Sequence, residues 1–222
     1  MKINILTLFP DYLNAFCNQS MIAKALELGH IEINIINFRD YSLDKHHKVD
    51  DSPYGGGAGM LLQIEPIDLA LQPLKNSHKI LLSPQGKVFS QKKAHELAKL
   101  NEITLICGHY EGFDERITKL VDEEISIGDF ILTGGEIAAM AISEAVARLI
   151  PGVLRKNSYE NESFEGNGLL DYPQYTRPAV YKGMKVPKIL LSGNHLEIEK
   201  WRLKKAREIT RKKRPELLKK GK

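Results

Sequence analysis

Short apolar stretches bounded by turn residues recur along the first half of the chain. Residues 3–9 form an apolar run that stops at Pro10, and residues 31–38 alternate largely between apolar and polar side chains, so both stretches predict strands. Residues 79–83 and 103–107 are brief and apolar, which is typical of buried strands in a parallel sheet. The pattern therefore predicts a sheet that contains these four strands.

Segments with helical spacing separate and follow the strands. Residues 21–28, 91–100 and the alanine-rich residues 135–149 predict helices. At the start of the last helix, Thr133 and Glu136 have the spacing of a capping box, in which each side chain takes one free backbone amide. Strands that alternate with helices predict an α/β fold with a parallel sheet and flanking helices.

The last third of the chain has a different character. Residues 155–168 are polar, have no period of 2 or 3.6, and predict a linker or mobile loop. Prolines punctuate the next stretch, and residues 195–207 and then 211–220 predict basic helices. We therefore expect three parts: a first domain at 1–154, a flexible linker at 155–170 and a small, basic, all-α domain at 171–222.

Charge is concentrated at the end of the chain. The 222 residues carry a net charge of +4, yet residues 200–222 alone hold twelve Lys or Arg against two Glu, so residues 1–199 have a net charge of −6. A basic segment favours a polyanionic partner, since each phosphate contact releases counterions. A solvated terminal helix would have the same composition. Charge alone therefore leaves both readings open.

Composition excludes several classes of protein. The chain is 42% hydrophobic and 27% charged, as globular proteins are, and it has no apolar run near the roughly 20 residues that cross a bilayer. Residues 3–9 are a poor signal peptide, because no small-residue cleavage site follows them. Cys17 and Cys107 cannot form a disulfide framework or complete a zinc site alone. We expect a cytoplasmic protein with no metal centre and no membrane partner.

Glycine-rich loops are the densest chemical feature. Residues 50–60 hold four glycines within five positions, but they match neither a phosphate-binding Walker loop nor a dinucleotide fingerprint, and a flexible surface hairpin is an alternative. Residues 83–87 and 108–112 each follow one of these predicted strands, and residues 127–129 follow a further short stretch, 124–126, that we expect to be a parallel strand. Ligands of open α/β sheets bind at that carboxyl edge, so the three loops predict a pocket.

The side chains near this pocket do not suit hydrolysis. There is no G-x-S-x-G nucleophile motif, and Cys107 has no evident catalytic partners. His109 fits a general base or a solvated loop histidine, and Asp171 fits a general base or a turn cap, so local sequence leaves both roles open. A pocket rich in backbone donors and acceptors favours a nucleotide-like cofactor that brings its own reactivity.

Six segments carry a resemblance to a known family. They are DSPYGGGAGM at 51–60, LSPQG at 82–86, CGHYEGFDER at 107–116, SIGDFILTGGE at 126–136, LLDYPQYTRP at 169–178 and LSGNH at 191–195. In this order and over nearly the whole chain, the sequence resembles the bacterial tRNA (guanine-N1)-methyltransferases of the SPOUT superfamily.

The resemblance implies a fold and an activity. It implies a deep trefoil knot at the end of the sheet that binds S-adenosylmethionine in a bent form, and a homodimer with a shared active site. It implies methylation of N1 of the guanosine at tRNA position 37, beside the anticodon and after another guanosine, which supports reading-frame maintenance. It leaves a requirement for Mg²⁺ open.

The resemblance also implies roles for individual residues. Asp171 matches the proposed general base, Glu111 matches a residue that restrains the methionine end of the cofactor, and Arg155 or Lys156 matches a basic residue, between which the sequence does not choose. The implied cofactor-binding residues are Leu82, Ser83, Pro84, Gln85, Gly86, Gly108, Tyr110, Ser126, Ile127, Gly128, Asp129, Phe130, Ile131, Leu132, Gly134 and Gly135. The implied tRNA-binding residues are Asp50, Gly55, Gly59, His195, Trp201 and Arg202.

Overall fold

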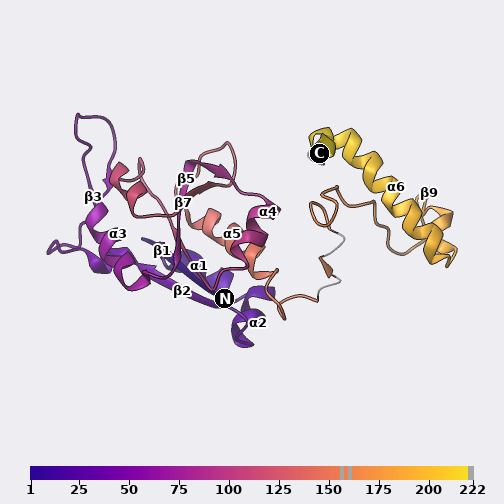
Figure 1. Ribbon diagram of the computed structural model, residues 1–222, viewed down its shortest axis with the longest axis horizontal. Helices are drawn as coiled ribbons and strands as arrows, with labels where there is room; N and C mark the ends of the chain where they lie inside the picture. Colours follow the sequence, from indigo (N-terminus) through magenta and orange to yellow (C-terminus); the bar gives the residue numbers. More distant parts are fainter. Residues whose placement is uncertain (156–157, 160–161, 220–222) are drawn as a thin grey trace. The chain divides into compact units, whose positions relative to one another are not determined.

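The chain forms two compact units, Met1–Leu154 and Arg155–Lys222, which are called here the first and the second unit. Their folds come from a computed structural model, shown in Figure 1, which describes residues 1–155, 158–159 and 162–219. Each unit is described by itself. Among the described residues, no helix is both long enough and apolar enough to cross a membrane.

A five-stranded sheet organises the first unit. Its strands follow the order β2-β1-β6-β5-β7, and every neighbouring pair is parallel. The strands are β1 (Lys2–Thr7), β2 (Glu32–Asn37), β5 (His78–Val88), β6 (Glu102–Ile106) and β7 (Glu123–Ser126). The predicted α/β fold with a parallel central sheet is confirmed.

The centre of the sheet is buried and largely apolar because β1 and β6 are covered on both faces. Ile3 pairs with Ile103 and Ile5 with Leu105, and all four side chains are completely buried. Burial of each such side chain stabilises the fold by about 1.5–3 kcal/mol. The double coverage also buries the polar side chains of Asn4 and Thr104, and Asn4 Nδ2 donates a hydrogen bond to Thr104 Oγ1 at 3.2 Å.

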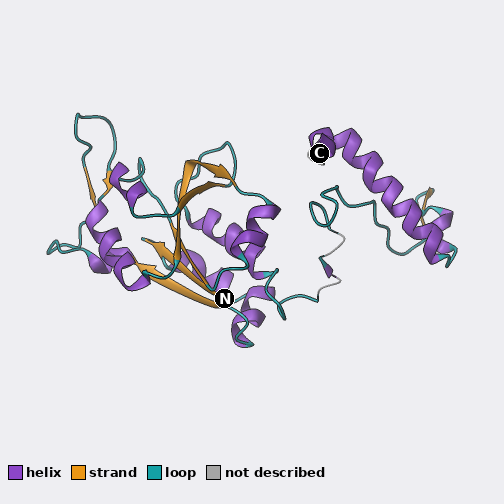
Figure 2. Cartoon of the chain, in the orientation of Figure 1, coloured by secondary structure: helices purple, strands orange, loops and turns teal. Residues whose placement is uncertain are grey.

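Helices flank the sheet. In Figure 2, α3 lies on one side of it and α5 on the other. The α5 helix packs against α1, α2, α4 and β1, whereas α3 packs with the short 3-10 helices η1, η2 and η3. The helices of the first unit are α1 (Asp11–Cys17), α2 (Ser20–Glu27), α3 (Ile64–Leu71), α4 (Gln91–Leu97), α5 (Glu136–Ala147), η1 (Phe38–Tyr41), η2 (Gln72–Leu74) and η3 (Glu115–Lys119).

The predicted capping box at the start of α5 is wrong. The N-cap residue of α5 is Gly135, and no side chain caps the helix there. Glu136 is the first helical residue, and its carboxylate instead accepts a hydrogen bond from Thr7 and contacts His109. Because those partners come from β1 and from a distant loop, the local spacing of Thr133 and Glu136 could not indicate them.

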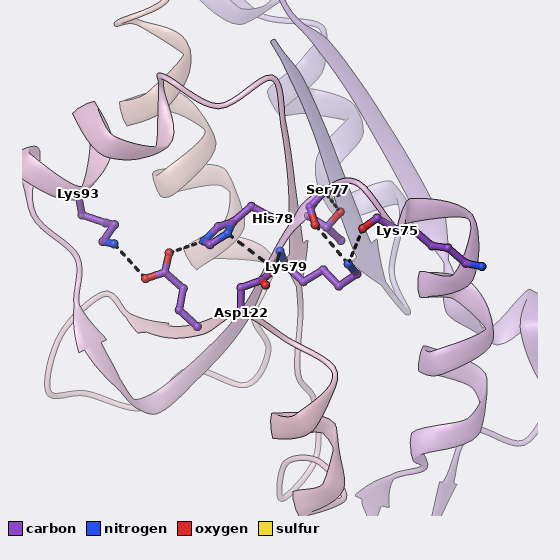
Figure 3. A network of polar contacts seen from close by, with 8 residues as sticks. Lys75, Ser77, His78, Lys79, Lys93 and Asp122 are labelled. Atoms are coloured by element: carbon purple, nitrogen blue, oxygen red, sulfur yellow. Dashed lines mark hydrogen bonds and ion pairs between the residues drawn. The ribbon is translucent and has the colours of Figure 1, made fainter.

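A network of polar contacts joins the amino ends of β5 and β7 to α4, as Figure 3 shows. His78 Nε2 lies 2.8 Å from Glu123 Oε1, and Lys93 Nζ lies 3.0 Å from Glu123 Oε2. His78 Nδ1 also lies 3.7 Å from Asp122 Oδ2. Burial acts to raise the pKa of Glu123, but the bonds from His78 and Lys93 outweigh it and hold this pKa below its usual value.

The second unit is built on one long helix, α6 (His195–Lys213). The two basic helices predicted at 195–207 and 211–220 are not separate there, because α6 continues to Lys213 and only then gives way to the 3-10 helix η6 (Pro215–Lys219). The unit also contains the 3-10 helix η5 (Lys188–Leu191) and a short hairpin of β8 (Val180–Tyr181) and β9 (Met184–Lys185), so its described residues are not all helical.

Side chains of α6 hold the segment before the hairpin. Thr210, which is completely buried, accepts a hydrogen bond from the Leu170 amide through its Oγ1 at 3.0 Å and donates to the Ala206 carbonyl at 2.7 Å. The Arg214 guanidinium lies 5.9 Å from the ring centroid of Phe164. Within the stretch that the sequence predicts as a linker, Leu170 therefore contacts α6 and Phe164 contacts Arg214, the residue that follows this helix.

Candidate active site

A cavity of about 540 Å³ opens at the carboxyl edge of β5, β6 and β7. Residues 81–85, 108–113, 124–128 and 130–135 form most of its wall. The strands are parallel neighbours, so the loops that follow them converge on one side of the sheet. The three glycine-bearing loops that the sequence places at one edge do meet around a single cavity, and its volume suits a ligand the size of a nucleotide.

Most of the implied cofactor-binding residues line this cavity. Gly86 and Asp129 are outside the lining. The residues that do line it are Leu82, Ser83, Pro84, Gln85, Gly108, Tyr110, Ser126, Ile127, Gly128, Phe130, Ile131, Leu132, Gly134 and Gly135.

The position of Gly86 is constrained by packing. A Cβ atom at this position would lie 2.5 Å from the carbonyl carbon of Glu124 and 2.5 Å from the amide nitrogen of Ile125. Leu82 and Lys87 both pair with Ile125, so residues 83–86 loop out of β5 toward the cavity and return to the same point of β7. Only a residue without a side chain allows this return.

Local hydrogen bonds shape the cavity loops. Ser83 Oγ accepts from the Gln85 amide at 3.1 Å, and Ser126 Oγ both accepts from the Gly128 amide and donates to the Gly128 carbonyl at 3.1 Å. Tyr110 has a φ of 58°, a left-handed conformation that a non-glycine residue adopts only where its surroundings hold it. The loops therefore present main-chain groups in defined orientations.

The cavity has no activated cysteine nucleophile. Burial and then the charge of the nearby Glu136 raise the pKa of the Cys107 thiol well above its usual value. A thiol reacts as a nucleophile only in its deprotonated form, and this one stays protonated at neutral pH. The described residues also contain no group of three or more His, Cys, Asp or Glu that could hold a metal ion. The wall is suited to binding and orienting a ligand.

The glycine-rich segment is a hairpin joined to the cavity wall. Its strands are β3 (Asp50–Asp51) and β4 (Leu61–Leu62). The Glu111 amide donates to the Met60 carbonyl at 3.1 Å, and a Cβ atom at Gly59 would lie 2.3 Å from Glu111 Cγ. Glu111 itself lines the cavity. Of the implied tRNA-binding residues, Gly59 thus lies beside the cavity wall, Asp50 lies in β3, and Gly55 lies in the open tip.

Asp171 belongs to the second unit, whereas the cavity belongs to the first. Its Oδ1 accepts from the Tyr172 amide at 2.7 Å, its Oδ2 accepts from Gln174 Nε2 at 2.7 Å, and its own amide donates to Ser163 Oγ at 2.9 Å. Arg155 is exposed at the start of the second unit. Lys156 lies outside the described residues.

The α6 helix carries the remaining implied tRNA-binding residues. His195 is its first residue, and Trp201 is half-buried. The Arg202 guanidinium lies 4.9 Å from the ring centroid of Tyr172, which follows Asp171 directly, so the carboxylate segment and the helix are in contact. A shallow groove on α6 is lined by Lys200, Leu203, Lys204, Arg207, Glu208 and Arg211.

Sequence reasoning overlooked two kinds of residue. Arg207 and Arg211 share one groove with Lys204, and their spacing of three and four residues could have indicated this common helical face. Thr7 and Glu136 were not predicted as neighbours of the cavity loops. No local signal could have found them, because they are 129 residues apart in the chain.

The chain also matches known proteins over its whole length. Residues 1–220 match the family model described as tRNA (Guanine-1)-methyltransferase TrmD. A protein of Metamycoplasma arthritidis named tRNA (guanine-N(1)-)-methyltransferase is 70% identical over 222 residues, which are 100% of this chain and 97% of that protein. Proteins with the same name from Mycoplasmopsis agalactiae and Fusobacterium nucleatum are 63% and 57% identical over 98% of this chain, and the matches cover 97% and 91% of those proteins. The chain therefore belongs to the tRNA (Guanine-1)-methyltransferase TrmD family, and it is a methyltransferase.

Proposed function

We propose that this protein transfers a methyl group from S-adenosylmethionine to N1 of the guanosine at position 37 of tRNA, beside the anticodon, and so supports reading-frame maintenance. The observation that carries the proposal is the full-length match to relatives that bear this enzyme name. The proposal includes the trefoil knot around the cavity loops, a homodimer with a shared active site and a cytoplasmic location.

The cavity in the first unit fits the proposed methyl donor. Its volume of about 540 Å³ lies within the range of cofactor sites, and its wall combines apolar side chains with backbone amides and carbonyls of three loops. Such groups suit an adenine, a ribose and an amino acid end. When bound, S-adenosylmethionine supplies an already activated methyl group, so the protein has to contribute alignment and proton transfer.

Asp171 supplies the proton acceptor in this proposal. Guanine N1 carries a proton and is a weak nucleophile until that proton leaves. A carboxylate within roughly 2.6–3.2 Å of the nitrogen can take the proton, and a general base of this kind contributes about 10²–10⁴-fold to the rate. Each oxygen of Asp171 accepts one hydrogen bond at present, and each has a further lone pair for the incoming proton.

Basic side chains complete the proposed site. Arg155, or Lys156 beside it in the sequence, would stabilise the negative charge that develops on the guanine oxygen as the proton leaves. The groove on α6 presents Lys204, Arg207 and Arg211 along one face of the helix, which suits the phosphates of tRNA. Trp201 and Arg202 lie on the same helix as these basic residues.

Methyl transfer to tRNA transcripts tests the proposal directly. We expect donor-dependent methylation that maps to N1 of guanosine 37 and turnover with inosine at this position, since inosine keeps the N1 proton. Adenosine has no such proton and should not react. Asp171→Asn should lower turnover by at least about 10²-fold and leave donor binding intact. Glu197→Gln is the control, because it neutralises an exposed carboxylate of α6, and it should change neither turnover nor donor binding.

Three results would contradict the proposal. The wild-type protein could fail to show binding heat with S-adenosylmethionine, which would favour an RNA-binding protein without catalysis. The methyl group could map to another atom or to ribosomal RNA. Asp171→Asn could also keep a rate close to that of the wild type, which would remove Asp171 from the role of general base.

A further inference from the structure

Glu136 is a buried acidic residue to which the proposed mechanism gives no role. Only 2% of its surface is exposed, although it is the first residue of α5 and lies next to two glycines of the cavity wall. A carboxylate removed from water is costly unless its oxygens are hydrogen-bonded. The hydrogen-bond partners of Glu136 therefore indicate its structural role.

Both oxygens of Glu136 have partners from other parts of the fold. Thr7 Oγ1, at the end of β1, donates to Oε1 at 2.6 Å, and His109 Nε2, in the loop after β6, lies 3.0 Å from Oε2. One side chain thus joins α5, β1 and a cavity loop.

The imidazole ring of His109 is held on a second side as well. Thr7 Oγ1 accepts a hydrogen bond from the Phe9 amide at 2.9 Å, and the ring of Phe9 lies 4.5 Å from that of His109, centroid to centroid. His109 is mostly buried, with 12% of its side chain exposed. The hydroxyl of Thr7 therefore orders both neighbours of the imidazole, the carboxylate and the phenyl ring.

Backbone contacts join two cavity loops at the same place. The Gly135 amide donates to the Gly108 carbonyl at 3.0 Å, and His109 forms an isolated antiparallel bridge with Gly134. A Cβ atom at Gly134 would lie 2.1 Å from His109 Nε2 and 2.4 Å from Glu136 Oε2. The missing side chain at this glycine makes room for the contact between His109 and Glu136.

We propose that Glu136 is a positioning residue, which with Thr7 and His109 fixes the loop at 108–112 against the loop at 133–135 and so sets the width of the methyl-donor cavity. The inference rests on the proposed function, because the cavity is taken as the donor site. Glu136 would act on donor binding through the loops. It would have no part in proton transfer.

This role predicts a split between binding and chemistry. A cavity of the wrong width loses contacts that the bound donor makes equally in the ground state and in the transition state, so KM for the donor rises while kcat changes little. A residue of the chemical step would instead lower kcat. A residue that only stabilises the fold would lower the melting temperature and leave the affinity of the folded protein unchanged.

Thr7 allows the test to be made away from the cavity wall, since its side chain does not line the cavity. Thr7→Val keeps the shape of the side chain and removes the hydroxyl, whereas Thr7→Ser keeps the hydroxyl. Glu136→Ala removes the carboxylate itself. Glu144→Ala is the matched control, because Glu144 is an exposed acidic residue on the same helix.

The experiment measures the dissociation constant of S-adenosylmethionine by calorimetry, together with kcat and KM for tRNA methylation. We expect Thr7→Val and Glu136→Ala to weaken donor binding by about 10-fold or more, with kcat at saturating donor within about 3-fold of the wild type. Thr7→Ser and Glu144→Ala should stay within about 2-fold in both quantities.

Two outcomes would contradict the inference about Glu136 and leave the proposed function unaffected. Thr7→Val and Thr7→Ser could bind the donor equally well, or the loss in Glu136→Ala could appear in kcat with the dissociation constant unchanged. In either case the wild-type protein would still bind S-adenosylmethionine and methylate tRNA. Failure of the wild type in those two assays would instead count against the proposed function.

Discussion

Replacing Gly86 by alanine places a methyl group where β5 returns to β7. The new Cβ atom would lie 2.5 Å from two backbone atoms of β7 and 2.7 Å from a third, the Glu124 carbonyl oxygen. Backbone atoms of a paired strand cannot rotate away as a side chain can. The strands must therefore separate by about 1 Å before the contact becomes ordinary, since carbon atoms attract one another best at about 3.5–4.0 Å.

The cost of this separation can be worked out from the contacts beyond Gly86. Overpacking by one methyl group costs about 1–3 kcal/mol. Lys87 and Val88 pair with β7, and the Phe89 amide donates to the Ser126 carbonyl at 2.8 Å, so this part of the pairing is lost as well. Each such bond contributes about 0.5–1.5 kcal/mol. We expect a total loss of about 2–5 kcal/mol, a large part of the roughly 5–15 kcal/mol that stabilises a typical protein.

Urea unfolding of Gly86→Ala and the wild type, followed by circular dichroism, measures this loss. The neighbouring Lys87 is exposed, so Lys87→Ala should stay within about 0.5 kcal/mol of the wild type and serves as the control. The loop at 82–85 lines the cavity, and donor affinity should fall together with stability in Gly86→Ala. Equal free energies of unfolding for Gly86→Ala and Lys87→Ala would refute the close approach of β5 to β7.

Two further predictions concern charge. The pKa of Glu123 is lowered in the folded protein, so the carboxylate contributes stability above its unfolded pKa of about 4.3 and loses it as the pH falls through the folded value. Glu123→Gln should therefore lower the free energy of unfolding by about 1 kcal/mol at pH 7 and by progressively less below about pH 4, as thermal melts at several pH values can show; a difference independent of pH would contradict this. Replacing Lys204, Arg207 and Arg211 by glutamine should weaken tRNA binding and reduce the slope of log K against log salt by about 2–3, since each phosphate contact contributes about 0.7–0.9. The same change at three exposed lysines of the first unit (Lys24, Lys92 and Lys99) is the control, and an equal slope for both triple variants would show that the α6 groove does not contact phosphate.

Some elements were missed or misplaced for local reasons. The α3 helix was not predicted, because Pro66 interrupts its pattern. This proline lies in the first helical turn, where a missing amide hydrogen breaks no intrahelical bond. The basic stretch at the end of the chain was divided into two helices. In the structure α6 continues through residues 208–210, which separate the two predicted helices. Thr210 is buried there and donates a hydrogen bond to the Ala206 carbonyl.

The sequence by itself determined the parallel α/β fold, the edge of the sheet that carries the cavity and the family of the chain. Those inferences rest on apolar periodicity, on the rule that loops after parallel strands share an edge, and on motifs that run along the chain. Only the tertiary structure decided that Gly86 packs against β7 and that Glu136 binds Thr7 and His109. A local pattern records which side of an element is buried, but it does not name the partner there, and these partners lie between 27 and 129 residues away from Glu136 along the chain.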